Sequence, residues 1–153
     1  MREILFRGKP TEPFKDFLTF RPEHCENGFV FGSLIVNPDG RFYICVHGIC
    51  SNKSNINNGI TTMVEVIPET VGQYIGLKDD NGKKVFEGDI LESPVKRIGE
   101  KYGNLVLIRD IRKCNFASFV VASYHIIDNI HDNPELETTL YRQKKYNYIW
   151  LGE

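Results

Sequence analysis

The chain has 153 residues, which suits one ordinary domain or two very small ones. Hydrophobic residues make up 41% and charged residues 25% of the chain, so a disordered or collagen-like protein is excluded. With 19 basic and 20 acidic residues the net charge is -1, and the chain therefore lacks the strong basic field that holds nucleic acid non-specifically.

Targeting signals are missing from the sequence as it stands. Charged residues interrupt the first seven positions, so the apolar core of a signal peptide is absent. The longest charge-free, largely apolar stretch is residues 114–127, whereas a membrane-spanning helix needs about 20 apolar residues. We therefore expect a cytoplasmic protein without a membrane partner, whose four cysteines are reduced thiols.

Strand patterns dominate the first half, at residues 4–7, 28–36, 41–46 and 61–67. The turn sequence at residues 37–40 joins two of them, so we predict a β-hairpin there. Gly32 inside its first strand indicates a bulge or a close backbone approach. The polar residues 51–59 are typical of a loop, and residues 69–74 are interpreted as one helical turn.

Strand patterns continue in the second half, at residues 83–86, 90–92, 105–111 and 116–124. Residues 79–82 end in Asn81-Gly82, which supplies the backbone angles of a tight hairpin turn. Heptads, internal repeats and sustained helical periodicity are absent from the sequence. We therefore predict a mainly β protein with few short helices.

The chain is predicted to form two small β subdomains, because one group of strands ends and another begins at residues 72–78. The predicted segments are residues 1–75, residues 76–137, and an aromatic and basic extension at 138–153. Each half is too short for a large core, so packing of the halves or assembly of several chains is expected to compensate.

Common catalytic and nucleotide-binding motifs are missing from the sequence. It contains no GxxxxGK[ST], GxGxxG, HExxH or GxSxG pattern. The acidic turn that begins at Asp79 resembles a calcium loop superficially, but Lys84 stands where that loop needs glycine. A hairpin turn explains these residues fully.

Cysteines and histidines form one candidate cluster. Cys45, His47 and Cys50 lie close in sequence, and His24-Cys25 lies in an earlier turn. Zinc needs four such ligands in tetrahedral array, and this spacing matches no standard zinc module. A cysteine nucleophile with His47 or His24 as its base is a second alternative. We favour structural thiols, and hence no bound metal.

Carboxylates form a second candidate cluster. Glu87 and Asp89 flank Gly88, with Glu92 close behind, and paired carboxylates can perform acid–base or metal chemistry. An aspartate after glycine at a strand entry more often accepts hydrogen bonds from nearby backbone N–H groups. We therefore interpret Asp89 as a turn-capping residue.

The C-terminal run at residues 141–151 mixes aromatic residues with basic ones. Such rings can stack on nucleobases while the cations contact phosphates. Tyr146, Tyr148 and Trp150 also alternate as in a half-buried strand, and we favour this interpretation. An edge strand can pair across a symmetric interface, so a homo-oligomer is expected.

The sequence resembles the YopX family in four blocks that follow one another in the chain. The central block is the most specific and comprises VGQYIGLKD at 71–79, NGK at 81–83 and EGDI at 87–90. The other blocks are residues 2–9, residues 28–35 and residues 126–136. Phe29 and Phe31 stand where the family commonly has Trp and Tyr.

The resemblance implies a mainly β protein of phages, prophages or other mobile elements of a bacterial host. It also implies that the second half resembles an SH3-like small barrel. The family has no established activity, so it supplies no catalytic, cofactor-binding or metal residues. The aromatic and basic tail after Thr138 departs from the pattern, and the resemblance says nothing about it.

Three function hypotheses follow from these observations. The first is a non-enzymatic protein that works by binding, with a phage or host protein as partner, or by self-assembly. The second is a nucleic-acid-binding accessory protein, supported by the tail and by analogy with other small barrels. The third, which we favour least, is an enzyme with a Cys–His or carboxylate site.

Overall fold

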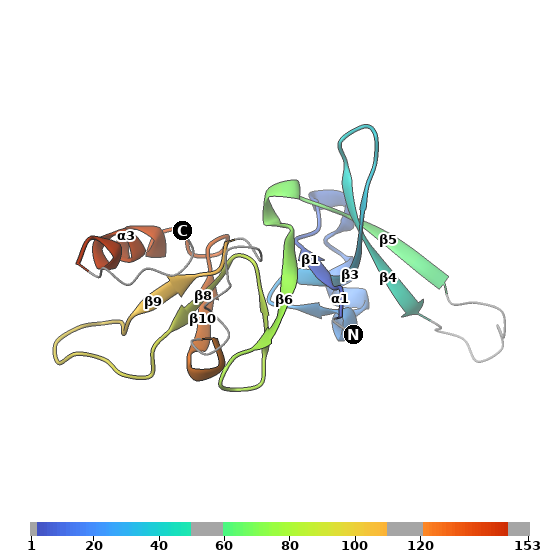
Figure 1. The fold of residues 1–153 in the computed structure, drawn as a ribbon. Helices are drawn as coiled ribbons and strands as arrows, with labels where there is room; N and C mark the ends of the chain where they lie inside the picture. The colour runs from blue at the N-terminus through green and yellow to red at the C-terminus, as the bar shows by residue number, and fades with distance from the viewer. Residues whose placement is uncertain (1–2, 50–59, 110–120, 147–153) are drawn as a thin grey trace. The chain divides into compact units, whose positions relative to one another are not determined.

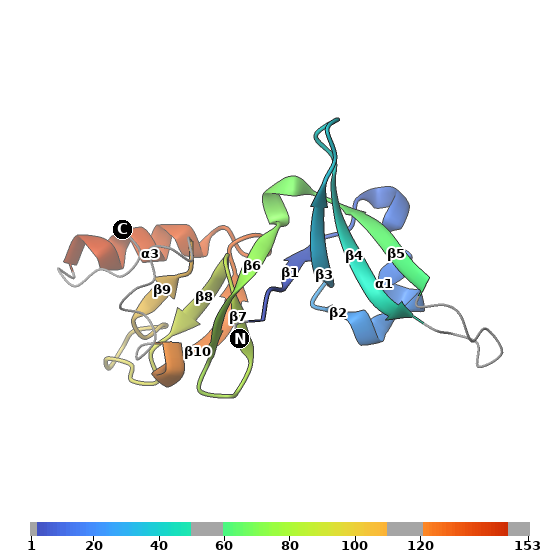
Figure 2. The ribbon, with the colours of Figure 1, turned by 45° about the vertical axis from the view of Figure 1, so that its right-hand side comes forward.

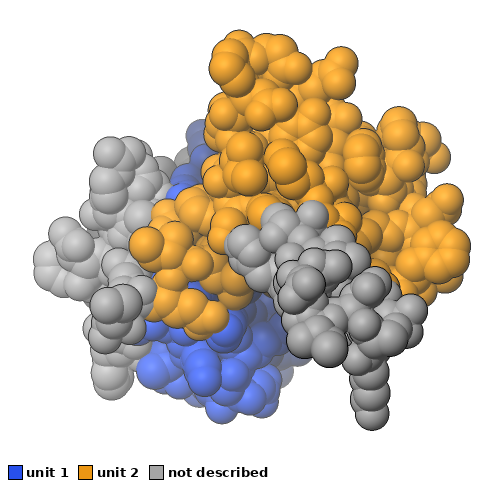
Figure 3. Space-filling view, turned by 90° about the vertical axis from the view of Figure 1, so that its right-hand side faces the viewer, with its two compact units in different colours: residues 1–2, 74–153 blue, residues 3–73 orange. Residues whose placement is uncertain are grey.

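The structure, a computed structural model, describes residues 3–49, 60–109 and 121–146. The chain divides into two compact units: unit 2 comprises residues 3–73, and unit 1 comprises residues 1–2 and 74–153. Figure 1 follows the chain through both units, and Figure 3 colours them separately. Each unit has its own core, and the prediction of a mainly β protein is confirmed.

Unit 2 is an antiparallel sheet with short helices. Its elements are β1 (Phe6–Gly8), η1 (Glu12–Phe14), α1 (Phe17–Phe20), η2 (Pro22–His24), β2 (Cys25–Glu26), β3 (Phe29–Val36), β4 (Phe42–Ile49), β5 (Ile60–Val66) and η3 (Pro68–Thr70). The order β5-β4-β3-β1 confirms the predicted hairpin as β3 and β4. Its turn is held by Asp39, whose Oδ1 accepts a hydrogen bond from the Arg41 N–H at 3.0 Å.

One face of the unit 2 sheet carries its core. Leu34, Ile44 and Val64 lie opposite one another on β3, β4 and β5, and Ile44 and Val64 are fully buried. The neighbouring residues of the same cluster are Val30, Val46, Val66, Phe14, Phe17 and Leu18. Each buried side chain of this kind contributes about 1.5–3 kcal/mol of hydrophobic stabilisation.

Gly32 lies where β3 and β4 approach each other closely. A Cβ atom at this position would collide with the backbone carbonyl oxygen of Cys45. The prediction of a close backbone approach at Gly32 is therefore confirmed, since only glycine fits without a shift of the β4 backbone.

Strand β6 (Gly72–Lys78) runs from the end of unit 2 into unit 1. Gln73 lies opposite Phe6 of β1, and Tyr74 lies opposite Phe86 of β7 (Lys84–Phe86). The predicted helical turn over residues 69–74 is therefore wrong beyond the short η3. Pairing with a strand more than sixty residues earlier in the chain overrides the weak local preference.

Unit 1 contains a second, three-stranded antiparallel sheet. Its further elements are β8 (Asp89–Glu92), β9 (Leu105–Leu107), β10 (His125–Asn129) and α3 (Leu136–Tyr146), and the strand order is β10-β8-β9. Helix α3 lies along β9 (Figure 2). Apolar clusters occupy both faces of β8, because Ile90 packs with Leu136 and Leu140 of the helix while Leu91 packs with Val85 and Val106.

The predicted strand over residues 141–151 is wrong for the part that the structure describes. Residues 141–146 form the end of α3, in which Leu136 and Leu140 are four residues apart and both buried. Helix-favouring residues such as Arg142 and Gln143 surround them. Tyr148 and Trp150 lie outside the described residues, so their predicted alternation stays a prediction.

Two further strand predictions are confirmed only in part. The predicted strand over residues 105–111 is shorter, since β9 ends at Leu107 and residues 110 and 111 lie outside the described part. The predicted strand over residues 116–124 is wrong at residues 121–123, which are helical. Val121 is buried there among the apolar residues of β6, β7 and β8, so tertiary packing decides its conformation. The predicted loop at 51–59 lies outside the described residues.

The described parts of unit 1 do not test whether its strands close into an SH3-like barrel, which stays a prediction. Within residues 3–49, 60–109 and 121–146, no helix has the length and apolar character needed to cross a membrane.

Candidate functional site

The cysteines and histidines of the first predicted cluster lie in unit 2. Cys45 is buried on β4, while Cys50 lies outside the described residues. The Cys25 thiol donates a hydrogen bond to the Arg21 carbonyl oxygen at 3.3 Å. Partial burial, and then the Glu23 carboxylate, raise the pKa of the Cys25 thiol, which disfavours the nucleophilic thiolate. The Cys25 thiol is therefore less ionised than a free cysteine at the same pH.

In the described part of the chain, the histidines do not belong to any group of side chains that could bind a metal ion. His24 closes η2, with its Nε2 3.7 Å from the Glu23 carboxylate, and His47 lies on β4. Among residues 3–49, 60–109 and 121–146, no group of three or more His, Cys, Asp or Glu side chains is arranged to hold a metal ion. The absence of zinc stays a prediction.

The carboxylates of Asp79 and Asp89 hold turns. Asp89 is 2% exposed, and its Oδ2 accepts a hydrogen bond from the Phe86 N–H at 2.8 Å. Asp79 Oδ1 accepts from the N–H groups of Asn81 at 3.0 Å and Lys83 at 2.9 Å, and its Oδ2 accepts from the Ile126 N–H at 3.0 Å. Both carboxylates are thus engaged in backbone capping, which agrees with the turn interpretation of Asp89.

Glu92 is buried at the end of β8 and anchors the following loop. Its Oε2 accepts a hydrogen bond from the Gly103 N–H at 3.0 Å. Its Oε1 lies 3.3 Å from Nε2 of His125, whose Nδ1 is 3.9 Å from the Asp80 carboxylate. Glu92 therefore fixes both the loop and the neighbouring strand β10. The sequence did not indicate this role, because Gly103 is eleven residues further along the chain.

The loop between β8 and β9, residues 93–104, is closed tightly at its base. The Ser93 N–H donates to the Asn104 carbonyl oxygen at 2.9 Å. A Cβ at Gly103 would lie 2.7 Å from the Ser93 carbonyl oxygen and 2.9 Å from that of Val95, so this position requires glycine. The base of the loop is consequently a fixed structure, although most of its side chains are exposed.

Gln143 of α3 clamps the helix to the loop base. Its Oε1 accepts a hydrogen bond from the Leu105 N–H at 2.7 Å, and its Nε2 donates to the Gly103 carbonyl oxygen at 2.9 Å. Leu140 and Leu136 are buried on the same side of the helix, one turn and two turns earlier respectively. One side chain therefore sets the distance between α3 and residues 103–105.

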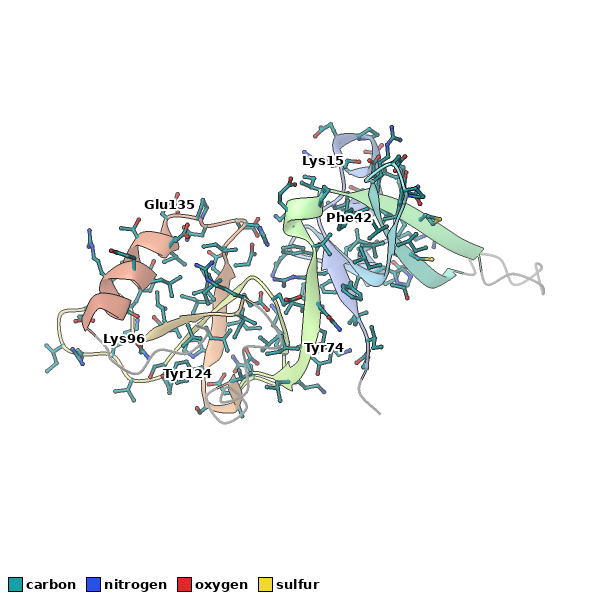
Figure 4. All side chains as sticks on the ribbon, turned by 45° about the horizontal axis from the view of Figure 1, so that its top comes forward. Lys15, Phe42, Tyr74, Lys96, Tyr124 and Glu135 are labelled. Carbon is teal, nitrogen blue, oxygen red and sulfur yellow. The ribbon has the colours of Figure 1, made fainter. Side chains whose placement is uncertain are left out.

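A pocket of about 620 Å³ lies between this loop and α3. The charged and aromatic loop residues that line it are Arg97, Glu100, Lys101 and Tyr102, and the helix contributes Thr139, Arg142 and Gln143. Figure 4 shows the side chains of both elements, with Lys96 on the loop and Glu135 just before α3 as landmarks. The volume falls in the range of small-ligand sites.

The pocket lining is basic and partly aromatic. Arg97, Lys101 and Arg142 are exposed, and none of them forms an ion pair with another residue that the structure describes. The Lys101 ammonium lies 5.4 Å from the centre of the half-buried Tyr102 ring. Glu100 is the acidic member of the lining. This arrangement can bind an anionic or aromatic ligand.

The family model described as YopX protein matches residues 45–137. The chain belongs to the YopX family. The match covers the β8–β9 loop and ends just after the start of α3, so this YopX protein forms one wall of its pocket from residues within the match and the other from residues beyond it. No curated protein matches the chain. The resembling blocks at residues 2–9 and 28–35 lie outside the matched residues.

The sequence indicates the basic character of one pocket wall but not its helical structure, and it does not indicate the other wall. The aromatic and basic run at residues 141–151 includes Arg142 and Gln143, although its pattern favours a strand. The loop at 93–104 matches no binding motif, although it contains Lys96, Arg97 and Lys101. The signal that points to it is a basic, glycine-containing segment with Tyr102 between two apolar strands.

Proposed function

We propose that this YopX protein acts by binding and not by catalysis, and that the pocket between the β8–β9 loop and α3 is its binding site. The observation that carries the proposal is the set of cations on both walls, Arg97 and Lys101 on the loop and Arg142 on the helix. None of these three has an ion-pair partner among the described residues.

The fixed base of the pocket supports a binding role. Glu92, Gly103 and Gln143 hold the two walls together through hydrogen bonds that involve buried or half-buried groups. A ligand that enters a preformed site loses less of its binding energy to ordering the protein. The pocket therefore suits recognition by side chains that are already brought together.

The chemistry of the lining favours binding over an enzymatic reaction. Among the described lining residues, Glu100 supplies the carboxylate and none is histidine or cysteine. General acid–base and nucleophilic catalysis most often use such groups in hydrogen-bonded pairs. Thr139 contributes a hydroxyl group, and the part of the lining that the structure describes has no histidine or cysteine to activate it.

Self-assembly is the second part of the proposal. Large apolar side chains are exposed in unit 2, and Phe20 and Ile4 are 74% and 72% exposed. Such side chains suit burial between copies of the chain. Light scattering of the full chain at tens of micromolar is expected to give a mass of at least two chains, and a monomer would remove this part of the proposal.

The biological setting follows from the family resemblance. We propose a cytoplasmic protein of a bacterial host, encoded by a phage or another mobile element, with a phage or host molecule as its ligand. The near-balanced charge of the chain supports a local, selective site over general attraction to polyanions.

The binding role is tested by capture from extracts of phage-infected host cells. The full chain is compared with the pocket variant Arg97→Gln/Arg142→Gln and with a control, Lys15→Gln/Arg41→Gln, which loses the same charge from exposed positions of unit 2. We expect a captured molecule that the pocket variant loses and the control retains. Equal capture by both variants would contradict the proposed site.

A further inference from the structure

We propose that the pocket binds single-stranded nucleic acid, with backbone phosphates against Arg97 and Arg142 and a base against Tyr102. This inference rests on the proposed function and names the ligand class of the same site. It depends on three features of the lining: the two guanidinium groups, the aromatic ring, and the local excess of positive charge.

The two arginines come from opposite walls. Arg97 lies on the β8–β9 loop and Arg142 on α3, and both are exposed and line the pocket. A guanidinium group offers several N–H donors in a planar fork that fits phosphate oxygens. Two such groups across one pocket suit a ligand that carries successive negative charges, as a nucleic-acid backbone does.

The aromatic component is Tyr102. Its ring is half-buried, lines the pocket and has the Lys101 ammonium nearby. Single-stranded nucleic acids are held by stacking of bases on aromatic rings next to cations that track the backbone. Acidic peptides also pair with arginine but have no base to stack, so the ring favours a nucleotide ligand.

The two sequence segments that supply the pocket walls are rich in basic residues. Residues 93–104 and helix α3 hold six of the 19 basic residues of the chain but two of its 20 acidic residues. The remainder of the chain is consequently acidic, which limits non-specific attraction elsewhere. A compact pocket of about 620 Å³ accepts a flexible single strand with splayed bases more readily than a rigid duplex.

The probe is a fluorescent oligothymidylate, and fluorescence anisotropy measures its binding to the full chain over a range of salt concentrations. Arg97→Gln/Arg142→Gln is expected to weaken binding and to reduce the slope of log K against log salt by about 1.4, the value for two lost phosphate contacts to a single strand. The control Lys15→Gln/Arg41→Gln is expected to keep the slope of the parent.

A matched pair of tyrosine variants tests stacking. Tyr102→Leu retains apolar packing but removes the ring, and binding is expected to weaken roughly tenfold. Tyr141 is 71% exposed on the same helix as Arg142 but does not line the pocket, so Tyr141→Leu is expected to bind like the parent. Circular dichroism and thermal melting of each variant separate loss of binding from loss of fold.

The outcomes test the proposed ligand class separately from the proposed location of the binding site. An unchanged salt slope in the arginine variant, or no binding of oligothymidylate by the folded parent, overturns this inference. If the parent then binds polyglutamate, or captures a nuclease-resistant protein from extract, and the arginine variant loses either, the proposed binding role stands with an acidic protein as ligand. Equal capture by the arginine variant and its control overturns both proposals.

Discussion

Unit 2 and unit 1 are stabilised by different kinds of buried side chain. Among the described residues, the buried polar side chains of unit 2 are Arg7 and Thr70. Those of unit 1 are Asp79, Asp89, Glu92 and Asn129. Unit 2 therefore depends mainly on the apolar face of its sheet, whereas unit 1 also depends on acids and amides that bond to its backbone.

Strand length explains the difference. Strands β3 and β4 have eight residues each, so their ladders satisfy most of the backbone groups between them. Strands β7 and β9 have three residues each, and more of unit 1 lies in turns and loops. Buried backbone groups outside a ladder need other partners, which the carboxylates supply. Loops fixed in this way suit a binding site better than a regular sheet face does.

The largest effect is expected in the core of unit 2. Ile44→Ala removes a fully buried side chain from the middle of the sheet, and should cost about 2–5 kcal/mol of unfolding free energy through lost burial and a cavity. Val36→Ala on β3 is the control, because Val36 is 54% exposed. Amide hydrogen exchange, resolved by peptide, should accelerate more in β3–β5 than in β8–β9. Equal acceleration in both regions would contradict separate stabilisation of the two units.

The second effect is expected at a capping carboxylate of unit 1. Asp89→Ala leaves the buried Phe86 N–H without its acceptor, which should cost about 1–3 kcal/mol. Asp39→Ala, at an exposed turn of unit 2, should change stability by less than about 0.5 kcal/mol. Urea unfolding measures both variants. If Asp89→Ala unfolds like the parent but loses a measurable activity, a catalytic interpretation of Asp89 replaces the structural one.

A smaller effect is expected at the clamp between α3 and the loop. Gln143→Ala removes the partners of the Leu105 N–H and the Gly103 carbonyl, and should cost roughly 1–2 kcal/mol. Exchange of the Leu105 amide should accelerate, while the neighbouring exposed substitution Arg142→Ala should leave it unchanged. A Leu105 amide that stays equally protected in Gln143→Ala would show that the clamp does not hold the loop.

The smallest effect concerns the Cys25 thiol of unit 2. Because its pKa is raised, the folded thiol stays protonated at a pH where the unfolded thiol ionises. Alkylation of Cys25, followed by peptide mass spectrometry, should therefore reach half its maximal rate at a higher pH in the folded chain than in denaturant. The small stabilisation from this thiol is present below its ordinary pKa and is lost as the pH rises through the folded value. A lower midpoint in the folded chain would contradict the burial of the thiol.

The sequence predicts unit 2 better than unit 1 for a physical reason. The hairpin of β3 and β4 is encoded locally by alternation and by the turn at residues 37–40, and its partner strand follows directly. In unit 1, residues 121–123 are helical although their sequence favours a strand, because Val121 packs on apolar residues more than ten positions away. Helix α3 is set by Leu136 and Leu140 packing on β9, which the alternating aromatic residues of the tail obscure.

The pocket could be predicted only in part. Its helical wall was visible as the basic run around Arg142, but the opposing wall depends on Gln143 bonding to residues 103 and 105, about 40 positions earlier. The capping role of Asp89 was predictable, because its partner is three residues away. Hydrogen bonds between residues close in sequence can thus be predicted from the sequence. The long-range contacts that assemble the pocket cannot.

We propose that unit 1 carries a preformed pocket for single-stranded nucleic acid and that unit 2 does not take part in binding. Amide NMR spectra of the full chain, recorded while oligothymidylate is added, test this claim most directly. We predict saturable shifts at residues 97–105 and along α3, with β3, β4 and β5 unchanged. Shifts confined to unit 2, or an unchanged spectrum at saturating oligothymidylate, would contradict it.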